Sequence, residues 1–142
     1  MIIPDVNLLL YAIDEGSVHH QRARDWLEAS LSGTEMVGLP WVVLLAFLRL
    51  STRSQLFAEP LASSEAFDIV EGWLAQPCAV TVEPTARHLA ILRGLVEPVG
   101  SAGNLTTDAH LAALAIENGA ELCSADRDFG RFPGLRWTNP LG

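Results

Sequence analysis

The sequence contains no lysine: its nine basic side chains are all arginine, set against 17 acidic ones. The missing lysine excludes P-loop ATPases, in which a lysine contacts the β- and γ-phosphates, and Schiff-base enzymes, which need a reactive amine. The formal net charge of −8 argues against a module that binds duplex nucleic acid through a basic face. It leaves open an enzyme that gathers carboxylates around a cation and contacts nucleic acid briefly.

Cysteine is scarce, and long apolar segments are missing. Cys78 and Cys123 stand alone without metal-ligand spacing, so we expect both to be small buried side chains. The most apolar stretch, residues 36–48, has 13 residues without a charge, whereas a bilayer span takes about 20. Residues 1–5 hold no basic stretch of the kind that begins a signal peptide. We therefore expect a soluble, cytoplasmic protein with no membrane partner.

The chain has the size and composition of one folded domain. Its 142 residues are 49% hydrophobic and 18% charged, which is enough to bury a core and excludes extensive disorder. Short strand-like runs alternate with longer helix-like ones, a pattern typical of a parallel sheet covered on both faces. The sequence therefore predicts a single domain over residues 1–142, of class α/β with three-layer α/β/α architecture. Strands are expected at residues 1–5, 36–39, 79–82 and 120–124, with a short edge strand at 135–138.

Helices are expected between these strands, each marked by start and stop signals. Ser17 or a neighbour can cap the first of these, and Gly33 and Gly119 are placed to end helices. The expected ranges are 18–32, 41–51, 63–75, 85–96 and 107–118, with a glycine-containing loop at 100–104. The apolar positions expected to face the core include Val18, Leu27, Phe67, Val70, Leu89 and Leu92.

Three aspartates follow or adjoin the predicted strands. Asp5 ends the first strand, Asp126 follows the fourth, and Asp108 lies in the first turn of the helix before that fourth strand. Because binding crevices in parallel α/β folds lie outside the carboxyl ends of the strands, we expect the three acids at one edge. Clustered carboxylates repel one another unless a cation is present. A hard divalent cation such as Mg²⁺ would remove that repulsion.

Each acid also has a simpler role open to it. Asp5 could cap the helix that follows it, and Asp108 could complement a helix dipole. Asp126 and Asp128 could be turn residues. A shared site explains all the placements together, whereas the simpler roles explain each one separately. We therefore predict that Asp5, Asp108 and Asp126 are catalytic metal ligands, with Asp128 as an auxiliary acid.

Other polar residues near these acids are candidates for supporting roles. Asn7 and Thr107 could orient the carboxylates, although Asn7 could equally be a helix-start residue. Arg49, Arg53 and Arg127 are candidates for contacts with phosphate groups, with ordinary surface charge as the alternative.

Histidine and tryptophan offer no competing site. The four histidines share no zinc-ligand spacing. His110 is two residues from Asp108, about 200° around a helix, so we expect it to point away from the acids. The tryptophans are expected in the core or a dimer interface rather than stacked on bases. The helix after Asp108 is rich in small residues that would let it approach the sheet closely: Ala109, Ala112, Ala113 and Ala115.

In these segments the chain resembles PIN-domain nucleases, and among them the VapC toxins of toxin–antitoxin operons. The matching segments are residues 3–11 (IPDVNLLLY), 39–49 (LPWVVLLAFLR), 104–115 (NLTTDAHLAALA) and 124–129 (SADRDF). The resemblance implies a PIN fold and an endoribonuclease that uses Mg²⁺ or Mn²⁺. It also implies a homodimer, a VapB-like antitoxin as partner, and structured RNA, often tRNA, as substrate.

The second of these segments departs from the family pattern. The family places a glutamate where this chain has Ala46, and no acid lies nearby. Asp5 and Asp108 could still hold the cation, with Asp126 or Asp128 and water completing its shell. The alternative is a catalytically weak or silent PIN-like domain that acts mainly by binding a protein partner. A response-regulator or phosphatase-like domain is disfavoured by the missing lysine and the absence of a second acid beside Asp5.

Overall fold

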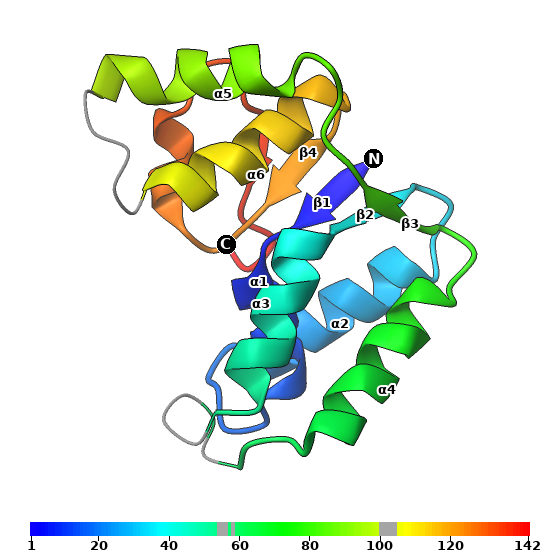
Figure 1. The fold of residues 1–142 in the computed structure, drawn as a ribbon. Coiled ribbons are helices and arrows are strands. Elements are labelled where there is room, and N and C mark those ends of the chain that lie inside the picture. Colours follow the sequence, from blue (N-terminus) through cyan, green and yellow to red (C-terminus); the bar gives the residue numbers. More distant parts are fainter. Residues whose placement is uncertain (54–56, 58, 100–104) are drawn as a thin grey trace.

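The computed structural model describes residues 1–53, 57, 59–99 and 105–142, and within them five strands form one parallel sheet. The strand order is β3-β2-β1-β4-β5. Figure 1 labels the first four of these strands. The strands are β1 (Ile2–Pro4), β2 (Val37–Pro40), β3 (Ala79–Val82), β4 (Glu121–Cys123) and β5 (Trp137–Thr138). The α-helices are α1 (Val6–Ile13), α2 (His20–Leu31), α3 (Trp41–Ser51), α4 (Ser63–Leu74), α5 (His88–Val96) and α6 (Leu105–Glu117). Two short 3₁₀ turns are η1 (Glu97–Val99) and η2 (Arg127–Arg131).

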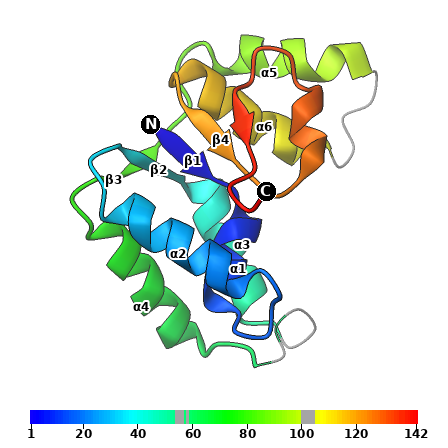
Figure 2. The same cartoon turned by 180° about the vertical axis from the view of Figure 1, so that it is seen from behind.

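Helices cover the sheet on both faces, which confirms the predicted α/β/α class. Helices α3 and α6 lie on the near side of the molecule in Figure 1, and α1 and α2 lie on the near side when it is seen from behind in Figure 2. The central strand β1 is buried along its whole length, with Ile3 fully inaccessible. A strand covered on both faces carries a continuous apolar run instead of an alternating pattern, as β1 does.

The strand order reverses beside β1. The chain first builds outward through β2 to β3, then crosses back through α5 and α6 and adds β4 on the other side of β1. Ligand crevices in parallel sheets lie at such a reversal, outside the carboxyl ends of the strands. The β1–β4 register pairs Pro4 with Cys123, so Asp5 and Ser124 follow as neighbours at that edge.

Several elements begin where the sequence predicts, and others do not. Helix α3 and strand β3 have the expected bounds. Helix α2 begins at His20, and Val18 before it is 93% exposed, so its expected place in the core is wrong. Phe67 and Leu89 are likewise wrong as core positions, being 54% and 76% exposed. On α4 the buried stripe is instead Ala66, Val70 and Trp73, which leaves the residue after Ala66 outside it.

Helix α6 packs as its alanines indicate. Ala109, Ala112, Ala113 and Ala115 are all fully buried, so the helix backbone lies close to the sheet. Gly119, with a φ of 63°, ends the helix in the left-handed conformation that favours glycine. The expected loop at 100–104 lies outside the described residues.

The cysteines and two of the tryptophans have definite places. Cys78 and Cys123 are both buried and unpaired, as expected. Trp73 packs edge-on against Phe47 in the core, whereas Trp41 on α3 is 46% exposed. Within the described residues, none of the helices is long and apolar enough to cross a membrane.

Candidate active site

Asp5 lies at the carboxyl end of β1 and is held by polar contacts on three sides. Its Oδ1 accepts a hydrogen bond from the Val6 backbone N–H at 2.7 Å, so Asp5 also caps α1. Its Oδ2 accepts from the Ser124 hydroxyl at 2.7 Å and from Asn7 Nδ2 at 3.2 Å. The capping role and the predicted site role are therefore compatible, because the carboxylate is fixed in orientation at the edge of the sheet.

Ser124 is a site residue that the sequence analysis missed. It is completely buried at the end of β4, and its Oγ accepts hydrogen bonds from Asn7 Nδ2 and the Asp126 backbone N–H. A serine hydroxyl accepts two hydrogen bonds and donates one, so both acceptor positions are filled and its proton is directed at Asp5. The only sequence signal was its place one residue beyond a strand that pairs with β1, and strand pairing is not visible in the sequence pattern.

Asp108 lies in the first turn of α6, with its side chain 34% exposed. Burial raises the pKa of Asp108 above its ordinary value, and repulsion from Asp5 and Asp126 raises it further. Burial likewise raises the pKa of Asp5, with a smaller contribution from Asp126, although the hydrogen bonds from Ser124 and Val6 oppose the rise. The structure thus brings the three predicted acids close enough to interact, from β1, α6 and the segment after β4.

Asp126 and Asp128 form the turn after β4. Asp126 Oδ1 accepts a hydrogen bond from the Asp128 backbone N–H at 2.9 Å and so caps η2. Asp126 therefore has the turn role that its sequence position also allows. Asp128 is exposed, and its charge contributes to the raised pKa of Asp108. The charges of both acids therefore act on Asp108, and one oxygen of Asp126 already accepts a hydrogen bond.

The donor atoms at this edge fit a hard divalent cation. They are carboxylate oxygens, the ligand type that Mg²⁺ prefers, and a cation would relieve the repulsion that raises the pKa of Asp5 and Asp108. As placed, no three histidine, cysteine, aspartate or glutamate side chains in the described ranges converge into a complete ligand set. The fit is therefore to an ion held by one or two carboxylates and several waters, which is usual for Mg²⁺.

Among the described residues predicted to support the acids, Asn7 contacts the site and Thr107 does not. Asn7 contacts Asp5 and Ser124, and its Oδ1 also accepts from the Ala125 backbone N–H at 3.4 Å, so it links β1 to the segment after β4. Thr107 is exposed on α6, and no hydrogen bond joins it to the acids in the described part of the chain. Ala46 is half-buried on α3 and supplies no ligand atom.

The candidate RNA-binding arginines do not contact the acids. Arg49, Arg53 and Arg127 are exposed, and none forms an ion pair within the described ranges. The arginine that reaches the cluster is Arg131 at the end of η2, with its Nη2 at 3.9 Å from Asp108 Oδ2. The sequence pattern does not indicate Arg131, because the length of the turn after Asp126 determines which basic side chain lies next to α6.

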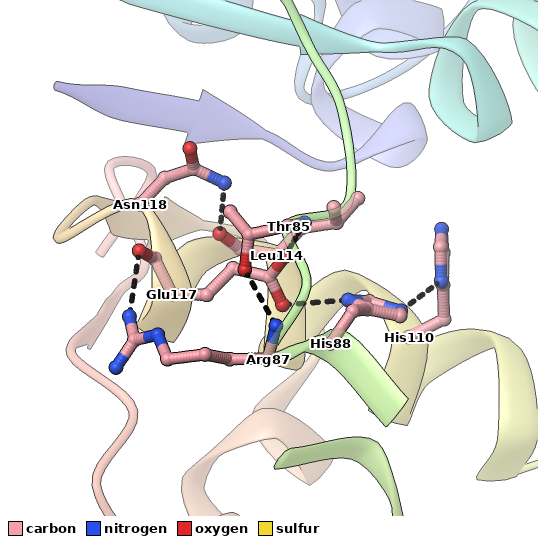
Figure 3. Close-up of polar contacts among 7 residues, drawn as sticks. All are labelled: Thr85, Arg87, His88, His110, Leu114, Glu117 and Asn118. Carbon is pink, nitrogen blue, oxygen red and sulfur yellow. Dashed lines mark hydrogen bonds and ion pairs between the residues drawn. The ribbon is translucent and has the colours of Figure 1, made fainter. Parts of the chain in front are cut away.

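His110 belongs to a separate polar chain (Figure 3). Its Nδ1 lies 2.9 Å from His88 Nε2, and His88 Nδ1 lies 2.6 Å from a carboxylate oxygen of Glu117. The Glu117 side chain is fully buried and also accepts from the Thr85 backbone N–H. Burial lowers the pKa of His110, and His88 lowers it further. His110 is thus directed toward α5, as its helical position predicts.

Comparisons with known proteins agree with this geometry. Residues 2–135 match the PIN domain family. "Ribonuclease VapC37" of Mycobacterium tuberculosis is 51% identical over 140 residues, which cover 99% of this chain and 97% of that protein. "Ribonuclease VapC33" of the same species is 45% identical over 141 residues, with 99% of each chain covered.

Solved structures show the same fold. The structure of VapBC2 from Rickettsia felis, bound to a DNA fragment from its promoter, aligns with a TM-score of 0.71 at 20% identity and covers 98% of each chain. VapBC-1 from nontypeable Haemophilus influenzae aligns with a TM-score of 0.70 at 15% identity over the full length of both chains. The resemblance seen in the sequence is therefore confirmed: the chain belongs to the PIN-domain family, and within it the chain is a VapC homologue.

Proposed function

We propose that this protein is a metal-dependent endoribonuclease and the toxin of a toxin–antitoxin pair. The observation that carries the proposal is the Asp5 carboxylate, which Ser124 and Asn7 fix at the carboxyl edge of the sheet, within electrostatic reach of Asp108 and Asp126. The names of its relatives, which describe them as ribonucleases, support the same activity. Mg²⁺ is the proposed ion, with Mn²⁺ as the alternative.

Each residue has a definite task in this proposal. Asp5 and Asp108 hold the cation, which when bound would polarise a scissile phosphate and acidify a bound water. Ser124 and Asn7 fix the Asp5 carboxylate in one orientation, because each donates a hydrogen bond to its Oδ2. Asp126 is tied by its backbone to Ser124 and completes the acidic edge, where it would position the cation or the attacking water.

The proposed substrate is structured RNA, with tRNA as the class implied by the resemblance to VapC toxins. Arg49, Arg53 and Arg127 remain the candidates for contacts with RNA phosphates away from the acids. Their exposure leaves their guanidinium groups accessible to a large substrate.

The proposed partner is a VapB-like antitoxin. Related solved structures are described as VapBC, and a hollow of about 730 Å³ lies between α2 and α4 on this chain. Its lining combines apolar side chains, among them Leu27, Ile69 and Trp73, with the charged Glu28 and Arg24. An amphipathic helix could bind there with its apolar face inward. We further propose a homodimer, for which Trp41 and Leu45 form an exposed apolar pair one turn apart on α3.

A second function is favoured by one observation. Helix α3 carries Ala46 where the family has a glutamate, so the site has one acid fewer than the pattern. The alternative is therefore a weak or silent PIN-like domain that acts mainly by binding its antitoxin.

The test is cleavage of mixed cellular RNA by the purified protein, with Mg²⁺ or with EDTA. We expect cleavage only with the cation, loss of cleavage in Asp108→Asn, and normal cleavage in the control Asp68→Asn on the exposed face of α4. Absence of cleavage by the parent with both Mg²⁺ and Mn²⁺, together with tight antitoxin binding, would establish the alternative instead.

A further inference from the structure

Arg131 is the basic side chain that forms an ion pair with an acid of the site in the described part of the chain. It ends η2, and its guanidinium approaches the half-buried Asp108 of the acid cluster. Figure 2 shows this orange-red turn next to α6. This chain has no lysine, so Arg131 is placed beside the proposed cation-binding acids as one of few basic side chains, and its role there has to be identified.

The contact with Asp108 does not by itself explain why Arg131 lies there. At 3.9 Å the Nη2–Oδ2 separation is too long for a hydrogen bond, and the two side chains are 39% and 34% exposed. Ion pairs this exposed contribute little to stability. The Arg131 guanidinium makes no hydrogen bond to another described residue, so its five N–H donors remain available to a ligand.

The guanidinium is nevertheless held in place. Its central carbon lies 5.4 Å from the ring centroid of Phe132, close enough for a cation–π contact. Phe132 is itself buried and packs at a tilted angle against the buried Phe129. A rigid aromatic platform therefore keeps the charge beside the acids, while its hydrogen-bonding edge stays open.

The positive charge of Arg131 opposes that of the surrounding acids. Asp5, Asp126 and Asp128 all act on Asp108, and Arg131 is the group that opposes them. An RNA phosphate approaching these carboxylates would be repelled, and one divalent cation offsets that repulsion only in part. Arginine suits the task, because its planar fork can bind two oxygens of one phosphate.

We propose that Arg131 binds an RNA phosphate beside the acid cluster, leaving Asp108 to the cation. This inference rests on the proposed ribonuclease function and assigns a substrate-binding residue within it. The competing explanation is that Arg131 merely neutralises Asp108 when the cation is absent.

The test measures RNA binding without cleavage. A fluorescein-labelled RNA hairpin of mixed sequence is titrated in EDTA over a series of salt concentrations and followed by fluorescence anisotropy. The proteins are the parent, Arg131→Gln, Arg131→Lys and the control Arg93→Gln, which removes an arginine paired with an exposed glutamate on the far end of α5. Calorimetry with Mg²⁺ alone is run on the same samples.

The two explanations predict different results. If Arg131 contacts a phosphate, Arg131→Gln weakens binding about tenfold and reduces the slope of log K against log salt by about 0.7 to 0.9, one phosphate contact. Arg131→Lys keeps the slope but loses part of the affinity, and Arg93→Gln changes neither. Unchanged RNA affinity and slope in Arg131→Gln, with tighter Mg²⁺ binding, overturn the proposal in favour of neutralisation.

The outcome is separable from that of the proposed function. If the parent cleaves RNA with Mg²⁺ while Arg131→Gln binds RNA as the parent does, only the role of Arg131 is wrong. If the parent cleaves no RNA, the ribonuclease function is wrong whatever the salt slope. If the parent neither cleaves RNA nor binds the hairpin, both are wrong.

Discussion

Replacement of His88 by leucine should be strongly destabilising, because it leaves the buried carboxylate of Glu117 without its main partner. The Glu117 side chain is fully inaccessible, and its oxygens accept from His88 Nδ1 and from the Thr85 backbone N–H. Since a carboxylate can only accept, the proton of this 2.6 Å contact lies on the histidine. The pair ties the last turn of α6 to α5, and the first turn of α6 carries Asp108.

The magnitude follows from this burial. Removing the partner of a buried carboxylate costs about 3–5 kcal/mol, because the remaining charge cannot be resolvated. The His88 side chain is 12% exposed, so some water can reach the gap, and we expect the lower end, about 3 kcal/mol. For a domain of this size that corresponds to a fall in Tm of about 10 °C.

Thermal and urea unfolding followed by circular dichroism would measure the loss. The matched control is His19→Leu, which replaces an exposed histidine just before α2. In the double variant His88→Leu with Glu117→Gln the buried charge is gone, so part of the lost stability should return. A cost below about 1 kcal/mol for His88→Leu, or no recovery in the double variant, would refute the reasoning about the buried charge.

Four further predictions concern the site and its partner. Asp5→Asn and Asp108→Asn should each fold and lose RNA cleavage. Burial raises the pKa of the Asp108 carboxyl, so its ionisation opposes folding once the pH exceeds the ordinary aspartate pKa. Asp108→Asn should therefore raise the Tm at pH 7 and leave it nearly unchanged at pH 3, where the carboxyl is largely protonated in both states. Ala46→Glu should tighten Mg²⁺ binding in calorimetry, and unchanged or weaker affinity in a folded variant would mean that α3 does not face the cation. Single replacement of arginines in the C-terminal segment of the antitoxin should weaken its inhibition of RNA cleavage, and weaken it more at high salt. If every variant inhibits as fully as the parent antitoxin, inhibition depends on the apolar contacts instead.

Much of the fold was predictable because local patterns determine it. The alternation of short apolar runs with longer helical ones indicated a parallel sheet, and Gly119 marked the end of α6 correctly. Helix faces were harder to predict. Val18 lies before the first residue of α2 and Leu89 lies in the first turn of α5, and both side chains face solvent although they are apolar. The residue at which a helix starts determines which side chains point inward, and the sequence pattern did not give that residue correctly.

The acids of the site could be predicted from the sequence, but the residues that surround them could not all be predicted. Asp5 and Asp126 could be placed because residues that follow parallel strands meet at one edge. Ser124 could not, because its hydrogen bond to Asp5 depends on β4 pairing directly with β1. Arg131 depends on how the turn after Asp126 folds back, which tertiary contacts with Phe132 decide.

The central claim is that these carboxylates hold a divalent cation, and anomalous scattering from Mn²⁺ tests it most directly. Crystals of the protein soaked in Mn²⁺ should show one strong anomalous peak about 2 Å from carboxylate oxygens of Asp5 and Asp108. The same soak of Asp108→Asn should show a much weaker peak or none. A strong peak elsewhere, or no peak at Asp5 and Asp108 in a protein that cleaves RNA, would contradict the account.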